Sequence, residues 1–104
     1  MSDGKQQFWK IAEPWLAKPG VTKSTMMGFP CLRLEGKYFA SVHKDGTAMI
    51  IKLPEGRVLD LVAEGAGENF APAGRVFREW LAVPSDKSDT WADYLEEAHA
   101  FAGA

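Results

Sequence analysis

The chain has 104 residues, of which 46% are hydrophobic and 25% are charged. This length suits one domain built around one core, and this composition is typical of a globular protein rather than a disordered or fibrous one. The net charge of −2 excludes a protein that is strongly basic overall. Binding to phosphate backbones would therefore depend on a local basic patch.

The short apolar runs and the single cysteine limit the cellular compartment and the cofactors that the sequence predicts. The first ten residues are polar, and no apolar run approaches the ~20 residues that a membrane helix needs. Cys31 is the only cysteine, so an intrachain disulfide is impossible and a cysteine-based zinc site is not expected. The sequence therefore predicts a cytoplasmic protein, a single domain over residues 1–104, with no membrane contact, metal or cofactor.

Apolar residues recur at helical spacing near the start of the chain. Four of them follow the i, i+3, i+4, i+7 pattern: Phe8, Ile11, Ala12 and Trp15. They predict an amphipathic helix from about Asp3 to Ala17. Pro14 lies inside that range and removes a helical hydrogen bond, so we expect a kink, or a break near Glu13. The polar stretch from Val21 to Ser24 is expected to be a linker.

Two glycine turns divide the next stretch into three runs of strand-forming residues. The runs are Cys31 to Glu35, Tyr38 to His43 and Ala48 to Leu53. Gly36-Lys37 places glycine first in a two-residue loop, as a type II′ turn requires, and Asp45-Gly46 is typical of a type I′ or glycine-bulge turn. The stretch therefore predicts a three-stranded antiparallel meander.

Pairing the strands through these turns assigns side chains to the two faces of the meander. It places Arg33 opposite Ala40, Ala40 opposite Ile51, and Val42 opposite Met49. One face is then the expected core: Tyr38, Ala40, Val42, Met49, Ile51 and Leu53. The second face would carry four further apolar side chains, which are the predicted interface: Leu32, Leu34, Phe39 and Ile50. An apolar second face needs a cover, either another helix or a partner subunit.

The second half of the chain predicts helix, hairpin and helix. Pro54 opens a helix whose apolar stripe ends before Gly65. Glu68 to Ala71 and Val76 to Val83 are expected to form a second hairpin. A last amphipathic helix is indicated by five residues at helical spacing: Trp91, Tyr94, Leu95, Ala98 and Phe101. The predicted fold is α+β, in the order α-β(3)-α-β(2)-α with an antiparallel sheet.

The sequence contains no recognisable catalytic motif. His43 follows a strand and precedes a turn, where a side chain can reach a ligand, but no partner is evident. His99 lies on the last helix, and its charged form would suit a helix C-terminus without any function. Cys31 would need a base and a lowered pKa to act as a nucleophile, and neither is indicated. These three residues are expected to be structural or merely exposed.

Basic residues on the predicted strands and turns form the best candidate contact set. The predicted nucleic-acid-binding residues are Arg33, Lys37, Lys44, Lys52, Arg75 and Arg78. Tyr38 and Trp80 are their aromatic neighbours, and such a mixed strip is the kind of surface that binds nucleic acid. The alternative interpretation is that these charges serve solubility. Trp9, Trp15, Trp80 and Trp91 are many indoles for one small core, so an interface use of one or two is plausible.

The stretch PGVTKSTMMGFPCLRLEGKYFASVHKDGTAMIIKLP, from Pro19 to Pro54, resembles the MmcQ/YjbR-like family of small bacterial domains. More distantly it is similar to the amino-terminal domain of the competence regulator TfoX. The matching features are the Pro-Gly-Val stretch, a glycine-bearing loop before the first strand, the Gly36-Lys37 turn with Phe39-Ala40, and the His-x-Asp-Gly motif at His43. The resemblance implies a fold similar to secretion-chaperone-like domains, and it implies DNA binding, with no established catalytic residues.

Three functions follow as hypotheses. The first is a non-enzymatic domain that binds DNA through the basic strand positions. The second is a protein-interaction domain, such as a homodimer, that uses the second sheet face. The third, an enzyme or small-molecule binder that uses His43 and Cys31, would need a deep pocket holding both side chains.

Overall fold

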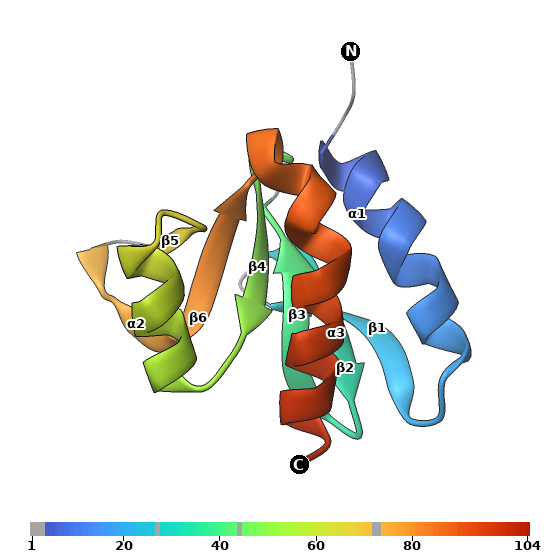
Figure 1. Ribbon diagram of the computed structural model, residues 1–104. Helices are drawn as coiled ribbons and strands as arrows, with labels where there is room; N and C mark the ends of the chain where they lie inside the picture. The colour runs from blue at the N-terminus through green and yellow to red at the C-terminus, as the bar shows by residue number, and fades with distance from the viewer. Residues whose placement is uncertain (1–3, 27, 44, 72–73) are drawn as a thin grey trace.

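A computed structural model describes residues 4–26, 28–43, 45–71 and 74–104. One six-stranded antiparallel sheet, in the order β1-β2-β3-β4-β6-β5, carries helices α1, α2 and α3 on one of its faces (Figure 1). The elements in chain order are α1 (Gly4–Ala12), the 3-10 helix η1 (Glu13–Ala17), β1 (Val21–Met26), β2 (Phe29–Leu34), β3 (Lys37–Val42), β4 (Ala48–Lys52), α2 (Glu55–Ala63), β5 (Glu68–Phe70), β6 (Phe77–Pro84), the 3-10 helix η3 (Ser85–Thr90) and α3 (Trp91–Ala102). The predicted α+β class and the order of its elements are confirmed, apart from one additional strand.

The first helix breaks where its proline predicts. Helix α1 ends at Ala12, and the chain continues as η1 with Pro14 in its first turn. A proline lacks the amide hydrogen that the fourth preceding carbonyl would accept, so it is tolerated at the start of a helical segment and not in the middle. The predicted break near Glu13 is therefore confirmed.

The stretch expected to be a linker is the edge strand β1. Residues Val21 to Met26 pair antiparallel with β2, from Val21 opposite Leu34 to Met26 opposite Phe29. Val21 is buried, whereas the next three residues are polar, so the stretch lacks the apolar alternation that identifies a half-buried strand. An edge strand is paired on one side only and tolerates such polar residues.

The β2–β3 turn differs from the predicted one by one residue. Glu35 and Gly36 form the two-residue loop, and both have positive φ, 50° and 85°. Two positive φ values are the signature of a type I′ turn, which matches the twist of the flanking strands. The predicted type II′ turn at Gly36-Lys37 is therefore wrong.

A β-bulge between the same strands overturns the predicted faces. Arg33 pairs with Tyr38, but Leu32 pairs with Ala40, so Phe39 is an extra residue on β3. A bulge reverses the in-and-out alternation beyond it. Leu32, Leu34 and Phe39 consequently lie in the core beneath the helices, and their assignment to the second face is wrong. Ile50 does lie on the second face. Tyr38, expected in the core, is half-buried and pairs with Arg33 outside it.

The other strand pairings follow the prediction. Ala40 lies opposite Ile51 and Val42 opposite Met49. Strands β5 and β6 form the expected second hairpin, and β6 also pairs with β4. Met49, Ile51, Leu81 and Val83 therefore lie side by side beneath the helices.

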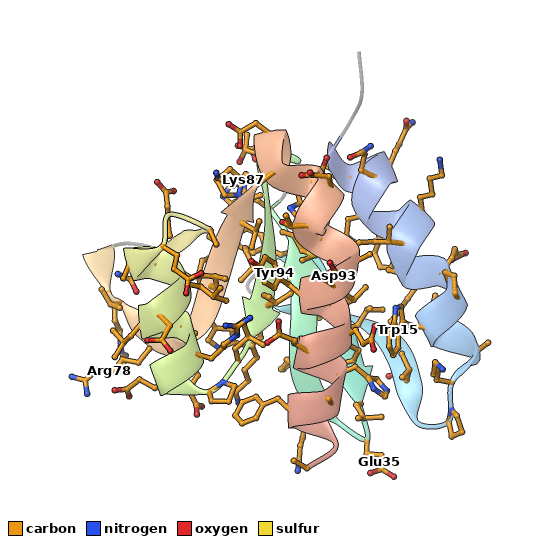
Figure 2. The ribbon with its side chains drawn as sticks, in the orientation of Figure 1. Trp15, Glu35, Arg78, Lys87, Asp93 and Tyr94 are labelled. Carbon is orange, nitrogen blue, oxygen red and sulfur yellow. The ribbon has the colours of Figure 1, made fainter. Side chains whose placement is uncertain are left out.

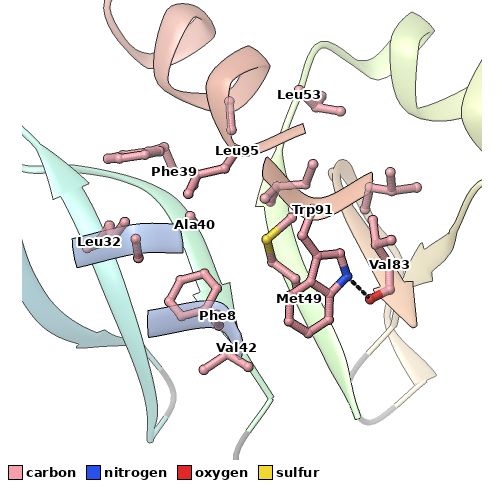
Figure 3. Close-up of a cluster of buried hydrophobic side chains, with 14 of the residues drawn as sticks. Phe8, Leu32, Phe39, Ala40, Val42, Met49, Leu53, Val83, Trp91 and Leu95 are labelled. Carbon is pink, nitrogen blue, oxygen red and sulfur yellow. Dashed lines mark hydrogen bonds between the residues drawn. The ribbon is translucent and has the colours of Figure 1, made fainter. Parts of the chain in front are cut away.

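The main core lies between the sheet and the three helices (Figure 3). Helix α1 contributes Phe8, α2 contributes Leu61, and α3 contributes Trp91 and Leu95, each with at most 1% of its surface exposed. The Trp91 indole Nε1 donates a hydrogen bond of 3.1 Å to the carbonyl oxygen of Val83. Burying one such large side chain contributes about 1.5–3 kcal/mol, so this face supplies most of the stability of the fold.

Candidate nucleic-acid interface on the uncovered sheet face

The face of the sheet opposite the helices has no helix over it and carries aromatic rings of the sheet itself. Phe29, Ile50 and Phe70 form a second buried cluster, against which Phe77 and Trp80 pack. The ring centroids of Phe29 and Phe70 are 6.4 Å apart, and those of Phe70 and Phe77 are 5.7 Å apart. Ile50 is left 1% exposed although no residue of this cluster belongs to a helix. We call this side the uncovered face.

A basic groove lies at the end of this face where β4 finishes and β6 begins. Its volume is about 480 Å³, and it is lined by Lys52, Glu55, Arg75, Val76, Phe77, Arg78, Glu79 and Trp80. Three of the six predicted nucleic-acid-binding residues meet here: Lys52, Arg75 and Arg78. Arg78 projects from the lower end of β6 in Figure 2. Residues from two separate stretches of the chain are therefore brought together by the β4–β6 pairing.

A second hollow adjoins the groove through a shared lysine. It has a volume of about 300 Å³ and is lined by Lys37, Tyr38, Lys52, Phe101, Ala102 and Ala104. The two hollows share Lys52, but Phe101, Ala102 and Ala104 place the second hollow beside the C-terminal end of α3, on the helix side of the sheet. Lys37, a fourth predicted residue, therefore lines the second hollow and not the uncovered face.

The charges in the groove nearly balance. Its three cations face two carboxylates, those of Glu55 and Glu79. The Lys52 Nζ lies 3.9 Å from Glu79 Oε1, and both side chains are partly exposed, at 37% and 48%. An exposed pair at this distance is weak and screened by salt, so an arriving phosphate can replace the carboxylate as the partner of Lys52.

Aromatic rings lie directly beside these cations. Lys52 and Trp80 are opposite each other in the β4–β6 register, so their side chains leave the same face of the sheet. The Arg75 guanidinium carbon lies 5.7 Å from the centroid of Phe77. The groove therefore combines positive charge with two partly exposed aromatic rings. Sequence reasoning identified Trp80 and missed Phe77, which does not stand out in an alternating strand pattern.

Arg33 stands apart from this surface. Its guanidinium carbon lies 5.1 Å from the centroid of the Tyr38 ring, and its Nε and Nη2 each donate to the carbonyl oxygen of Gly36 at 3.4 Å. These contacts brace the type I′ turn, and Arg33 lines neither hollow described above. Lys44, the sixth predicted residue, lies outside the described residues.

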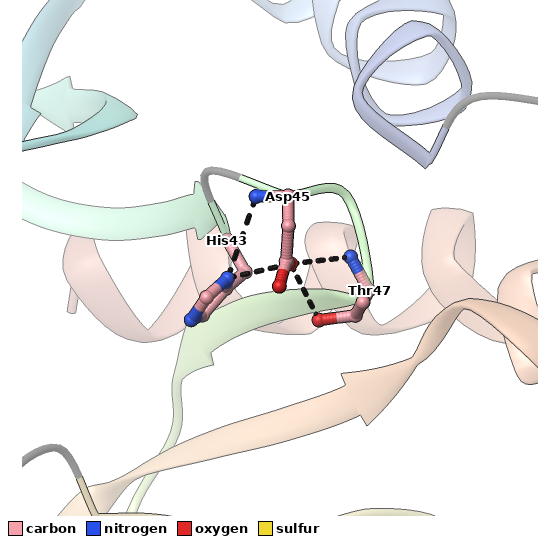
Figure 4. Close-up of polar contacts among 3 residues, drawn as sticks. All are labelled: His43, Asp45 and Thr47. Atoms are coloured by element: carbon pink, nitrogen blue, oxygen red, sulfur yellow. Dashed lines mark hydrogen bonds and ion pairs between the residues drawn. The ribbon is translucent and has the colours of Figure 1, made fainter.

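His43 belongs to a hydrogen-bonded turn (Figure 4). Its Nδ1 lies 2.6 Å from Asp45 Oδ1, and the same oxygen accepts bonds from Thr47 N at 3.0 Å and Thr47 Oγ1 at 2.6 Å. The bonds from Thr47, with a smaller contribution from His43, lower the pKa of Asp45 to about 2. The imidazole also packs on Phe29, with centroids 4.9 Å apart. The His-x-Asp-Gly motif thus has a structural explanation as a braced turn.

Cys31 is buried on the uncovered side of β2, opposite Ser41. Burial raises the pKa of its thiol, although the charge of Arg33 acts in the opposite direction. A thiol with a raised pKa is a poor nucleophile. Neither Cys31 nor His43 lines either of the two hollows described above.

His99 lies between aromatic rings on the helix side. Its ring centroid is 4.7 Å from that of Trp15 and 5.5 Å from that of Phe39. Its Nε2 is buried without a hydrogen-bond partner among the described residues. Its sequence position near a helix C-terminus suggested a charge role, whereas its surroundings are those of a packing residue.

Two kinds of feature, a metal-binding cluster and a membrane-spanning helix, are absent from the described part of the chain. Within residues 4–26, 28–43, 45–71 and 74–104, no group of three or more His, Cys, Asp or Glu side chains is placed to hold a metal ion. None of the helices within those residues is both long and apolar enough to cross a membrane.

Comparison with family models, with curated proteins and with solved structures gave no match. The resemblance of Pro19 to Pro54 to MmcQ/YjbR-like domains therefore stays a prediction. Among the surfaces described, the basic groove with its aromatic rings is the one best suited to a charged ligand.

Proposed function

We propose that this chain is a non-enzymatic cytoplasmic domain that binds nucleic acid, with DNA as the expected partner, through the basic groove at Lys52, Arg75 and Arg78. The observation that carries the proposal is the meeting of these three cations with Trp80 and Phe77 in one concave surface. Phosphate oxygens suit lysine and arginine, and aromatic rings suit bases. The cytoplasmic location is supported by the single cysteine, which is a buried free thiol.

Charge distribution explains how an acidic protein can bind a polyanion. The whole chain carries a net charge of −2, but the groove carries three cations against two carboxylates. The Debye length is about 8 Å at physiological ionic strength, so a phosphate in the groove responds mainly to the charges beside it. The local excess, with Lys37 adding to it in the neighbouring hollow, is small and implies modest affinity.

The test is a titration of a labelled DNA oligonucleotide at several salt concentrations. Three phosphate contacts predict a slope of log K against log salt concentration of roughly −2 to −3. The triple variant Lys52→Gln, Arg75→Gln, Arg78→Gln should lose most of its binding and flatten this slope. Absence of any binding by the unaltered protein at low salt would refute the proposal, since phosphate contacts are strongest there.

A matched control removes the same charge elsewhere. Lys10 on α1, Lys18 after η1 and Lys87 in η3 are exposed and line neither hollow. Lys87 lies at the opposite end of β6 from Arg78 (Figure 2). The triple variant Lys10→Gln, Lys18→Gln, Lys87→Gln should bind within about 3-fold of the unaltered protein, because steering by net charge alone is weak at physiological salt. An equal loss in both triple variants would mean that only net charge matters.

The second candidate function is self-association through the uncovered face. The observation that favours it is Val76, which is 50% exposed beside the half-buried Phe77 and Trp80. An apolar rim of this kind suits a partner surface. Sedimentation velocity over a 100-fold range of protein concentration tests it. This function is supported if the unaltered protein forms a dimer and the Val76→Glu variant does not. It is excluded if the unaltered protein stays monomeric throughout the range.

A further inference from the structure

We infer that the basic groove selects single-stranded nucleic acid over duplex, with Trp80 as a stacking platform for a base and Lys52 as the adjacent phosphate contact. This inference rests on the proposed function. It goes beyond it by naming the form of nucleic acid that the surface accepts.

The number of charges in the groove argues against duplex as the preferred ligand. A duplex-binding protein can make as many as 6–10 phosphate contacts. The groove offers three cations, partly offset by Glu55 and Glu79, and Lys37 adds one in the neighbouring hollow. Charge alone is therefore too small to hold a duplex firmly, and a second source of affinity is required.

The rings can supply that second source only to unpaired bases. Trp80 is half-buried, so part of its indole is open to the groove, and Lys52 stands opposite it on the neighbouring strand. A base that stacks on Trp80 would leave its own phosphate near Lys52 or Arg78. Stacking on one aromatic ring changes affinity by roughly 5- to 150-fold per base. In a duplex the faces of the bases are already stacked on each other and cannot reach a ring.

The arrangement of the helices points the same way. Major-groove readers insert a helix or a two-stranded ribbon into DNA. All three described helices pack against the other face of the sheet (Figure 1). The groove is a hollow to which helix α2 contributes only Glu55 of its first turn, so no described helix projects from this side. The hollow is shallow and wide, so its shape admits either form, and the preference for a single strand comes from stacking at Trp80.

A strand longer than one nucleotide could pass Lys52 and turn around the end of the sheet towards the second hollow, beside the C-terminal end of α3. Lys52 lines both, with Tyr38 and Lys37 on one side and Trp80 and Arg78 on the other. A strand that crosses Lys52 would meet an aromatic residue on either side of it. This alternation of ring and cation is what tracks a backbone while stacking its bases.

The experiment compares three labelled probes by fluorescence anisotropy at one salt concentration: a 15-nucleotide oligo-dT, a 15-nucleotide oligo-rU and a 15-base-pair DNA duplex. We expect at least one single strand to bind 10-fold or more tightly than the duplex. If either single strand binds more tightly than the duplex, the inference is supported, and a difference between dT and rU identifies the preferred strand. Duplex binding equal to or tighter than both single strands overturns it while leaving the proposed function intact. Failure of all three probes to bind overturns both.

Substitutions at Trp80 test the stacking role itself. Trp80→Leu should weaken single-strand binding by about 10-fold or more and leave duplex binding within 3-fold, whereas Trp80→Phe keeps a ring and should stay within about 3-fold. Tryptophan fluorescence of the unaltered protein gives a readout that does not need Trp80→Leu to fold. A single strand should quench it, Trp80→Phe should abolish the quenching, and Trp9→Phe on α1 should retain it. Unchanged single-strand affinity in Trp80→Leu, or quenching that survives Trp80→Phe, would contradict the assignment.

Discussion

The helix-covered face and the uncovered face of the sheet bury apolar side chains by different means. On the helix-covered face, Phe39, Met49 and Leu95 are 0% exposed because three helices close over them. On the uncovered face, Ile50 is buried by rings such as Phe70 that belong to the sheet itself. The basic groove lies at one end of this cluster. The first arrangement buries these side chains completely, whereas the second leaves Phe77, Trp80 and the neighbouring cations partly exposed. The main core and the proposed binding groove therefore lie on opposite sides of one sheet.

The largest expected effect contrasts two neighbours on β3 that the bulge sends to different environments. Phe39→Ala should lower the free energy of unfolding by about 3–5 kcal/mol, since it opens a cavity in the closed core. Tyr38→Ala should cost about 2 kcal/mol or less, because Tyr38 is half-buried, its ring packs beside Arg33, and its hydroxyl donates one exposed hydrogen bond of 3.2 Å to the carbonyl oxygen of Thr25. Urea unfolding of both variants measures the difference. Similar losses would mean that the two faces are not distinguished as the register indicates.

The next effect concerns the turn that sets this register. Gly36 has φ of +85°, and an added Cβ would meet only Arg33 Nη2 at 3.6 Å, so the cost of Gly36→Ala is conformational rather than steric. We expect a loss of about 1–2 kcal/mol in thermal or urea unfolding. Gly56→Ala is the matched control, because Gly56 lies in the first turn of α2 with open space around it and should be neutral or slightly stabilising. A neutral Gly36→Ala would contradict the type I′ turn.

A smaller effect is expected from an ion pair at the surface of the helical layer. Arg57 on α2 donates to Glu97 on α3 through Nε at 2.9 Å and Nη2 at 3.0 Å. The two side chains are 40% and 38% exposed, so solvent screening limits the pair to about 0.2–1 kcal/mol. A double-mutant cycle with Arg57→Ala and Glu97→Ala measures the coupling. A coupling near zero would show that the buried side chains of α2 and α3 position these helices without it.

The smallest effect is confined to acid pH and to the turn at the other end of β3. The pKa of Asp45 in the folded protein is about 2, below its ordinary value of 3.8. A lowered pKa contributes stability above the unfolded value, and that stability is lost as pH falls from about 4 to 2. Asp45→Ala should therefore be less stable than the unaltered protein at pH 6, and the difference in Tm should shrink near pH 2. Thr47→Val, which removes the hydroxyl donor, should reduce this pH dependence, and an unchanged difference at all pH values would refute the assignment.

Local sequence signals accounted for most elements of the fold. Pro14 predicted the helix break, and the Asp45-Gly46 turn predicted the β3–β4 pairing, because proline and glycine act through backbone geometry within a few residues. Trp80, Lys52, Arg75 and Arg78 were recognised as candidates from residue type and from their expected positions on strands and turns. Their meeting in one groove was not predictable, since it requires the pairing of β4 with β6 across the intervening helix α2.

Tertiary structure alone decided which side chains face which way. The period-2 pattern of β3 does not reveal where an extra residue enters, so the bulge at Phe39 reversed the expected faces of Leu32 and Leu34. Likewise the polar Val21 to Met26 becomes a strand only because β2 offers it a free edge. The sequence by itself determined the α+β class and its local turns, because these depend on backbone preferences. The division between a closed core and an open binding face depends on contacts between distant segments, and only the folded chain brings those together.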